Sequence, residues 1–255
     1  MKYKFMLFCA CAAGCFFSCR SKSTSSDSGK DALIVATSSW TAAYAQAAGA
    51  ENIIVLAPVN MIHPSEYELR PSDIPKLMNA SVIVYAGYEV MTERLKKGLD
   101  LSPDKMCLVK TEYDYETIEQ SVMAIAVRLG TEDAARENLL EIRNAFDEGR
   151  KIIAEKYRLD IRIVAHRLHA PLIKTLGLAP IVFFGPAAPE ASEIVAVSKT
   201  EALFILDNRH NPVGQPYREI LPNALYKQLL NFPGHLGTKT ISDVIRYNVA
   251  QLTSD

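Results

Sequence analysis

The chain has 255 residues and a formal net charge of −1, with 28 lysine and arginine residues against 29 aspartate and glutamate residues. This balance, without a long basic run, excludes the phosphate-neutralising surface of nucleic-acid binders, so we expect no nucleic acid as partner. Hydrophobic residues make up 49% of the chain, and its 13 prolines and 12 glycines exclude collagen-like and wholly disordered chains, which leaves one or two globular domains.

Residues 1–18 have the pattern of a signal peptide. Lys2 and Lys4 precede an apolar stretch over residues 5–17, which is too short to span a bilayer. The sequence around Cys19 resembles a bacterial lipoprotein cleavage site. We therefore expect lipidation of Cys19, with a serine-rich flexible tether over residues 19–31. Cleavage before Cys15, and a plain signal peptide or uncleaved anchor, are the alternatives.

Residues 32–131 alternate between short apolar runs and helical patterns, which predicts βαβ units and a parallel sheet. We expect strands at 32–36, 52–56, 81–85 and 106–110, and helices at 40–48, 72–79, 89–97 and 117–129.

Residues 132–158 contain no proline, begin with Glu132 and Asp133 after Thr131, and carry apolar residues at helical spacing. They predict one helix about 40 Å long at 1.5 Å per residue.

A second β/α series fills residues 159–255. The expected fold class is therefore α/β, with two lobes around a long helix. In the second lobe we expect strands at 161–165, 179–184 and 202–206, and helices at 168–176, 190–198, 221–230 and 240–252.

Polar side chains follow four of the expected strands, where open parallel sheets bind ligands. They are His63, Glu116, His166 and Asp207. Two imidazoles and two carboxylates from two lobes suit a divalent transition metal such as Zn(II), Mn(II) or Fe(II). Each also has a structural alternative: His63 as a turn residue, Glu116 as a first-turn helix acid, His166 as a helix cap and Asp207 as part of a turn.

Three further histidines have weaker signals. His210 follows Asp207 and suits the same turn, and His169 either shares a face with His166 or packs on the helix flank. We interpret His235 as a loop residue.

Several segments resemble the solute-binding proteins of zinc and manganese ABC importers (cluster A-I). The first is the run from Pro64 to Asp73 (PSEYELRPSD), followed by ASVIVYAG at 80–87. The others are VAH at 164–166, before a helix ending in LGL, and IRYN at 245–248. The resemblance covers essentially the whole chain after the leader. It implies two (β/α) lobes joined by a rigid helix, with one metal bound in the cleft between them.

The chain departs from the family pattern at three ligand positions. Ser65 stands where the family has its first histidine, Asp114-Tyr115-Glu116 replaces the segment of the second, and Asn231 falls near the last acidic ligand. Only His166 matches directly. A site with fewer imidazoles and more oxygen favours manganese or iron over zinc.

The resemblance implies a monomeric, exported, lipid-anchored binding protein that delivers a zinc, manganese or iron ion to an ABC permease. It implies no enzymatic activity and no catalytic cofactor, because the metal is the transported ligand. Histidine ligation predicts a metal affinity that decreases as the pH falls below about 6.5.

One alternative function is that of a protein of the same fold that has lost its metal and binds another small solute or a protein partner. The other is an exported metallohydrolase, for which the sequence has no His-Glu-x-x-His motif.

Overall fold

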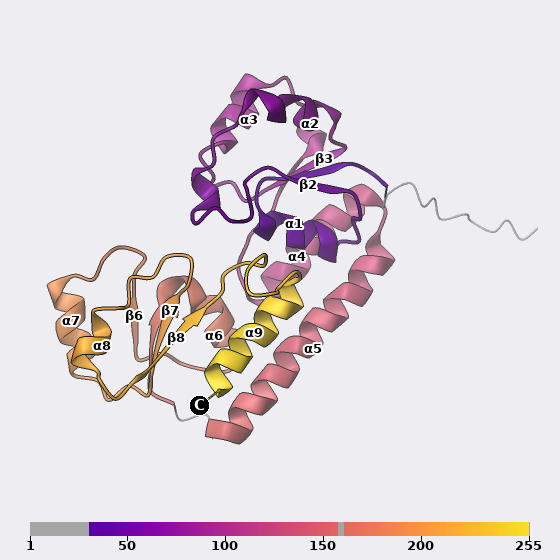
Figure 1. Cartoon of the computed structure of the whole chain (residues 1–255). Helices are drawn as coiled ribbons and strands as arrows, with labels where there is room; N and C mark the ends of the chain where they lie inside the picture. Colours follow the sequence, from indigo (N-terminus) through magenta and orange to yellow (C-terminus); the bar gives the residue numbers. More distant parts are fainter. Residues whose placement is uncertain (1–30, 158–160, 255) are drawn as a thin grey trace, which may run out of the picture.

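The computed structural model describes residues 31–157 and 161–254, which form two α/β lobes beside one long helix (Figure 1). The expected signal peptide, Cys19 and most of the tether lie outside the described residues. The N-terminal lobe has a parallel sheet in the order β2-β1-β3-β4. Its strands are β1 (Ile34–Ala36), β2 (Ile53–Val55), β3 (Val82–Tyr85) and β4 (Met106–Leu108), and its helices are α1 (Ser39–Ala47), α2 (Ile74–Asn79), α3 (Thr92–Gly98) and α4 (Tyr115–Leu129).

The C-terminal lobe repeats this plan, with a parallel sheet in the order β6-β5-β7-β8. The two sheets confirm the expected α/β class. The strands are β5 (Ile163–His166), β6 (Val182–Phe184), β7 (Phe204–Asn208) and β8 (Leu225–Leu229), and the helices are α6 (Ala170–Thr175), α7 (Ala191–Ser198), α8 (Tyr217–Ile220) and α9 (Ile241–Thr253).

The helix expected over residues 221–230 is wrong, because this segment contains β8. The run Leu225–Leu229 has no strong local preference for a strand, but it pairs along its whole length with β7. Pairing with an existing strand satisfies the backbone groups of both, and this tertiary contact outweighs the weak local helical preference.

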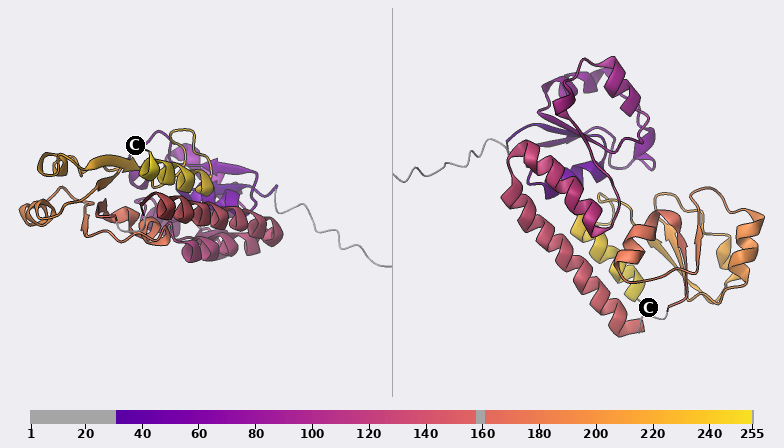
Figure 2. Two further views of the ribbon diagram at one scale, coloured as in Figure 1. Left: turned by 90° about the horizontal axis from the view of Figure 1, so that it is seen from below. Right: turned by 180° about the vertical axis from the view of Figure 1, so that it is seen from behind.

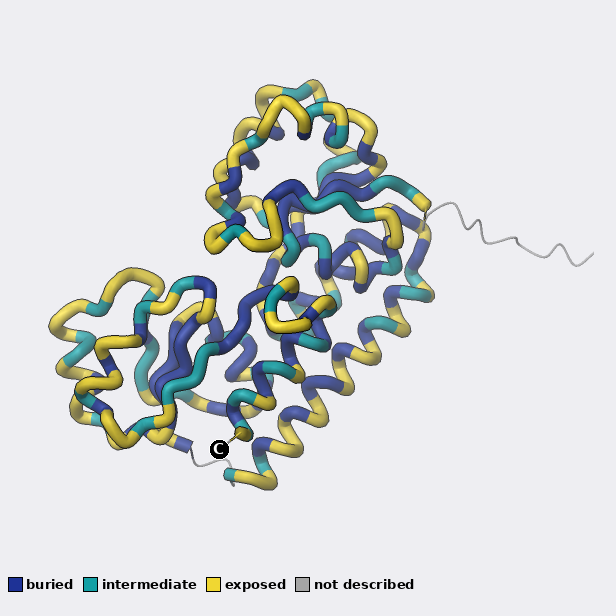
Figure 3. The backbone as a smooth tube through the Cα atoms, in the orientation of Figure 1, coloured by how far each residue is buried: buried dark blue, intermediate teal, exposed yellow. Residues whose placement is uncertain are grey.

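Each sheet is buried on both faces, which explains its continuous apolar strands. In the N-terminal lobe, Ile34 and Val84 face one cluster of apolar side chains, whereas Val35 and Ile83 face another. The tube in Figure 3 shows the strands of both lobes as buried and the outer loops as exposed.

Local capping signals define several helix ends. The Asp114 carboxylate accepts a hydrogen bond from the Thr117 N–H at the start of α4, and Gly130 ends that helix in the left-handed conformation. Thr240 and Asp243 form a reciprocal capping box at the start of α9. These side chains satisfy backbone groups that a helix terminus leaves open.

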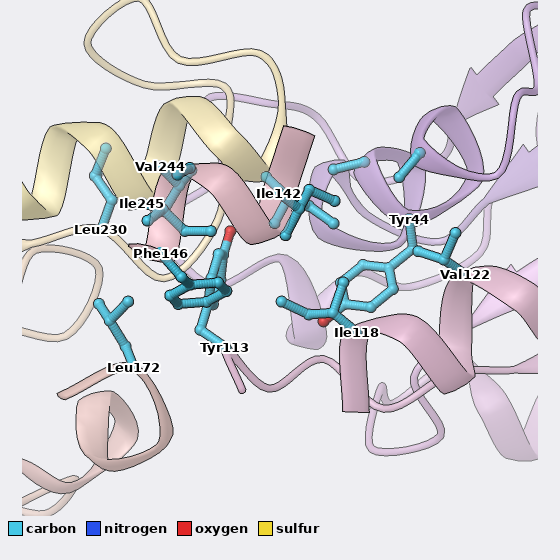
Figure 4. Packing of buried hydrophobic residues seen from close by; sticks show 14 of the residues in the cluster. Tyr44, Tyr113, Ile118, Val122, Ile142, Phe146, Leu172, Leu230, Val244 and Ile245 are labelled. Atoms are coloured by element: carbon cyan, nitrogen blue, oxygen red, sulfur yellow. The ribbon is translucent and has the colours of Figure 1, made fainter. Parts of the chain in front are cut away.

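The long helix α5 (Glu132–Tyr157) and α9 run side by side and bury one apolar core that belongs to both lobes (Figures 1 and 2). Figure 4 shows how side chains of both lobes meet there. The labelled members include Tyr44 (α1), Ile118 and Val122 (α4), Ile142 and Phe146 (α5), Leu172 (α6), and Val244 and Ile245 (α9). In the described part of the chain, none of the helices combines the length and the apolar character that a membrane crossing requires.

Gly149 lets α5 approach α9 closely. A Cβ atom at Gly149 would lie 2.6 Å from Cγ2 of Val249 and 3.0 Å from Cδ2 of Leu176. We expect Gly149→Ala to destabilise the protein by about 1–3 kcal/mol, because the packed core cannot absorb the added methyl group. Urea unfolding followed by circular dichroism measures this loss.

Gly98→Ala is the matched control, since Gly98 also lies in a helix and its Cβ would meet no atom within 4 Å. It should be neutral or stabilising by up to about 1 kcal/mol. A Gly149→Ala protein as stable as the control would contradict the close approach of the two helices.

Candidate functional site

A pocket of about 970 Å³ lies between the two lobes, which we call the inter-lobe pocket. Its walls come from the segments that follow β1, β2, β3 and β4 in one lobe and β5, β7 and β8 in the other. The carboxyl ends of both sheets therefore face one space, as in other open parallel sheets. Its lining includes Trp40, His63, Glu89, Tyr113, Arg167, Asn208, His210, Asn231 and Phe232.

Aromatic rings from both lobes meet at this pocket. Trp40, the single tryptophan of the chain, lies with its ring centroid 5.9 Å from that of Tyr113 and 5.8 Å from that of Phe232. Phe232 in turn stacks on His210, with centroids 3.7 Å apart and ring planes 19° apart. The ring of His235 lies 4.8 Å from that of His210. The indole of Trp40 thus connects the two lobes.

Buried polar atoms without a hydrogen-bond partner gather at the pocket. Considering only the described residues, neither ring nitrogen of the pocket residue His210 has such a partner, and neither does Nε2 of His235, whose ring lies behind the pocket lining, next to that of His210. An unsatisfied buried donor or acceptor costs about 1–3 kcal/mol, so this concentration marks a surface whose polar atoms water or a ligand would satisfy. The other pocket atoms of this kind are Trp40 Nε1, Tyr113 OH, Asn208 Nδ2 and Asn231 Oδ1.

His166 lies at the end of β5 and is wholly buried inside the C-terminal lobe. Its Nδ1 accepts a hydrogen bond from the Leu168 N–H at 3.2 Å, which assigns the proton of the neutral ring to Nε2. That nitrogen points at Gly185, where a Cβ atom would lie only 2.6 Å away. Burial lowers the pKa of His166, so the neutral form dominates near neutral pH.

His169 is also buried, one turn after His166. The backbone of Leu229 lies near its imidazole. Its Nε2 has no hydrogen-bond partner within the ranges that the structure describes. Burial lowers the pKa of His169 and of His210 to about 3, so both rings stay neutral in mildly acidic solution.

Asp207 is turned into its own lobe. One carboxylate oxygen accepts hydrogen bonds from the Gly214 N–H and the Tyr226 hydroxyl, and the other accepts one from the Asn208 N–H at 2.8 Å. Asp207 is completely buried and does not line the inter-lobe pocket. Its charge is balanced by these donors, which hold the loop after β7 in place.

Glu89 has the same function in the N-terminal lobe, although it does reach the pocket. Its carboxylate accepts hydrogen bonds from Thr37 Oγ1 at 2.6 Å, from two backbone N–H groups at 2.7 and 2.8 Å, and from Thr92 Oγ1 at 3.2 Å. The oxygen atoms of this buried acid are thus occupied by the loops that follow β1 and β3.

The structure brings only one of the four sequence-predicted ligands to the pocket. His63 is exposed and lines the wall beside Pro64. Glu116 lies exposed on the first turn of α4, where it accepts a hydrogen bond from Gln120, and it does not line the pocket. Sequence reasoning gave little weight to His210 and His235, whose proximity to Phe232 depends on loops far apart in the sequence.

A preassembled metal site is not present in the described residues: no three His, Cys, Asp or Glu side chains are grouped so that they could hold an ion. The free nitrogens of His210 and His235 nevertheless suit a metal, because neutral imidazoles with open lone pairs are good ligands for divalent transition metals.

Solved structures that share this fold include periplasmic metal-binding proteins. A Mn-bound periplasmic metal binding protein from Candidatus Liberibacter asiaticus matches with a TM-score of 0.66 at 15% sequence identity, over 87% of this chain and 98% of that one. The Cd-bound form of a periplasmic metal binding protein from that organism has a TM-score of 0.65 at 15% identity, with the same coverage. FpvC from Pseudomonas aeruginosa, an SBP in complex with Mn²⁺, has a TM-score of 0.70 at 16% identity, over 87% of this chain and 97% of that one.

No family model matches the sequence, and no curated protein matches it. The resemblance expected from the sequence motifs is confirmed at the level of the fold, including the two lobes and the long helix.

The buried neutral histidines make the stability of the fold depend on pH. An unfolded histidine binds a proton near pH 6.5, whereas folded His169 does so only near pH 3. The unfolded state therefore binds more protons between these values, and stability falls as the pH is lowered through them. We expect His169 to account for a loss of up to about 2 kcal/mol between pH 6.5 and pH 5.

Urea unfolding at several pH values tests this expectation. His169→Asn should remove its share of the pH dependence, because asparagine does not titrate in this range. His63→Asn, at an exposed position, should keep the wild-type dependence. An unchanged slope in the His169→Asn protein would show that this ring does not carry the effect.

Proposed function

We propose that this chain is the extracytoplasmic solute-binding protein of an ABC importer for a divalent transition metal. In this proposal it captures the ion in the inter-lobe pocket and delivers it to the permease, without catalysing a reaction. The observation that carries the proposal is the set of buried imidazole nitrogens without hydrogen-bond partners, recorded for the described residues of a fold shared with Mn-bound proteins.

The pocket residues favour His63 and His210 as the first contacts with the ion. They come from opposite lobes, and both line the pocket. His166 and Asp207 are less accessible, because each is buried within its lobe and held by hydrogen bonds. For Glu116 to bind the same ion, its side chain would have to reach the pocket from the exposed first turn of α4.

Export and membrane attachment belong to the same proposal. The leader pattern over residues 1–18 and the lipoprotein-like sequence at Cys19 favour a monomer tethered outside the cytoplasm by its lipid. The periplasmic proteins of the same fold support an extracytoplasmic location. A tether over residues 19–31 would leave the lobes free to meet a permease in the same membrane.

A second candidate is a protein of this fold that binds another small solute or a protein partner. It is favoured by the absence of a grouped triad in the described residues and by a pocket of about 970 Å³ with aromatic walls, which is larger than one ion needs.

Metal content and metal binding separate the two candidates. We expect the purified full chain to contain about one transition-metal ion per molecule, and the chelator-stripped chain to rebind one equivalent of Zn(II), Mn(II) or Fe(II). Elemental analysis measures the first quantity. The fluorescence of Trp40, which lies in the pocket wall, reports the second.

Mg(II) at the same concentration is the control for nonspecific charge effects and should leave the fluorescence unchanged. A chain that neither retains nor rebinds any transition metal would overturn the metal proposal and favour the second candidate.

A further inference from the structure

Large apolar side chains are exposed along the inter-lobe pocket. Ile62 of the N-terminal lobe and Leu168 of the C-terminal lobe both line it, with exposed fractions of 66% and 48%. Tyr88 is a further exposed side chain of this kind in the lining. Single apolar residues scattered over a surface are normal, but several around one cavity form a surface that a ligand would remove from water. A hydrated ion cannot cover this surface, whereas an organic molecule can.

Neutral polar atoms lie in the same lining, and in the described part of the chain they have no hydrogen-bond partner. Trp40 Nε1 and Asn208 Nδ2 can only donate a hydrogen bond. Asn231 Oδ1 can only accept one, and the hydroxyl of Tyr113 can do both. The orientation of the Asn208 amide is set, because its Oδ1 accepts a hydrogen bond from the His210 N–H at 3.0 Å. A ligand that satisfies these atoms must carry both acceptors and donors.

The charged groups of the lining favour a ligand without net charge. Lys110 and Arg167 are exposed, and so are Glu66 and Glu112, so that exposed cations and acids balance. Glu89 is buried, but its oxygen atoms already accept hydrogen bonds from the loops that follow β1 and β3. A charged ligand would lose its hydration among neutral groups, and this loss is costly without an opposite charge beside it.

The aromatic side chains of the lining favour a flat ligand. Trp40, Tyr113 and Phe232 line the pocket, and aromatic rings pack well against other rings in stacked or edge-to-face arrangements. The pocket volume of about 970 Å³ falls within the range of about 300–1,000 Å³ that is typical of sites for small organic molecules. A sugar fits less well, because the lining is mainly apolar and offers few partners for its many hydroxyl groups.

We propose that the inter-lobe pocket binds an uncharged, flat heteroaromatic solute. In this proposal the ring faces pack against Ile62 and Leu168. The donors and acceptors on the ring edge pair with Tyr113, Asn208 and Asn231. The inference rests on the second candidate of the proposed function, because it names the class of small solute, and it requires no metal ion.

Isothermal titration calorimetry of the full chain in excess chelator tests this inference. The probes are adenine, cytosine and nicotinamide, which are flat, uncharged near neutral pH and carry donors and acceptors on the ring edge. We expect at least one of them to bind. Nicotinate, which has the ring of nicotinamide with a carboxylate in place of the amide, is the charged control. It should bind at least about 10-fold more weakly than the tightest probe.

Two variants test the contacts of the bound probe. Ile62→Ser should raise its Kd by about 5-fold or more, because an apolar contact is lost. Asn231→Ala should raise the Kd by a similar factor, because a hydrogen bond is lost. Val127→Ser is the matched control, since Val127 is 63% exposed on α4 and does not line the pocket. Ile62 is exposed, so Ile62→Ser remains informative if Asn231→Ala fails to fold.

The outcomes separate this inference from the metal proposal. Probe binding by a chain that binds no transition metal would support the inference and overturn the metal proposal. A chain that binds Zn(II), Mn(II) or Fe(II) but none of the probes would overturn the inference and leave the metal proposal. Probe binding only when metal is added, tighter binding of glucose than of any probe, or an unchanged Kd in the folded pocket variants would also overturn the inference.

Discussion

The constraint on which the rest of the structure depends is the apolar face of α5, which both lobes bury at once. Its buried side chains share one core with α1 and α4 of the first lobe and with α6 and α9 of the second. Removing this surface from water stabilises both lobes, and it also determines where they lie relative to each other. The close approach at Gly149 shows that the fit between α5 and α9 tolerates no added atom without rearrangement.

This packing makes the carboxyl ends of two parallel sheets face each other across one pocket. Each lobe contributes a buried acid near that edge, Glu89 in one and Asp207 in the other. Their oxygen atoms accept hydrogen bonds from neighbouring loops and so hold the pocket walls in shape. A carboxylate used in this way is costly to withdraw, because its desolvated charge would lose its compensating donors.

The imidazole of His210 at the same edge differs from these two acids in its hydrogen bonding. His210 lies against Phe232 and is neutral because of its burial, and the described residues supply no hydrogen bond to its nitrogens. Such atoms lower the stability of the ligand-free protein, and a metal or another ligand that pairs with them recovers the loss. The stacked ring of Phe232 keeps the imidazole plane in place, so under the proposed function the ring would already be oriented before a ligand arrives.

The sequence alone determined the features that depend on short-range patterns. Continuous apolar runs such as Ile34–Ala36 predicted buried parallel strands, and the capped segment from Glu132 predicted the long helix and hence two lobes. The edge strand β8 was missed because its formation depends on pairing with β7 rather than on its own residues. The same distinction applies to the candidate site. The position of His63 after a predicted strand was enough to predict that it lies near the pocket. The inward direction of Asp207 and the contacts among His210, Phe232 and His235 depend on the tertiary structure. The direction of a side chain and its contacts with distant loops are decided by packing, which local residue preferences do not encode.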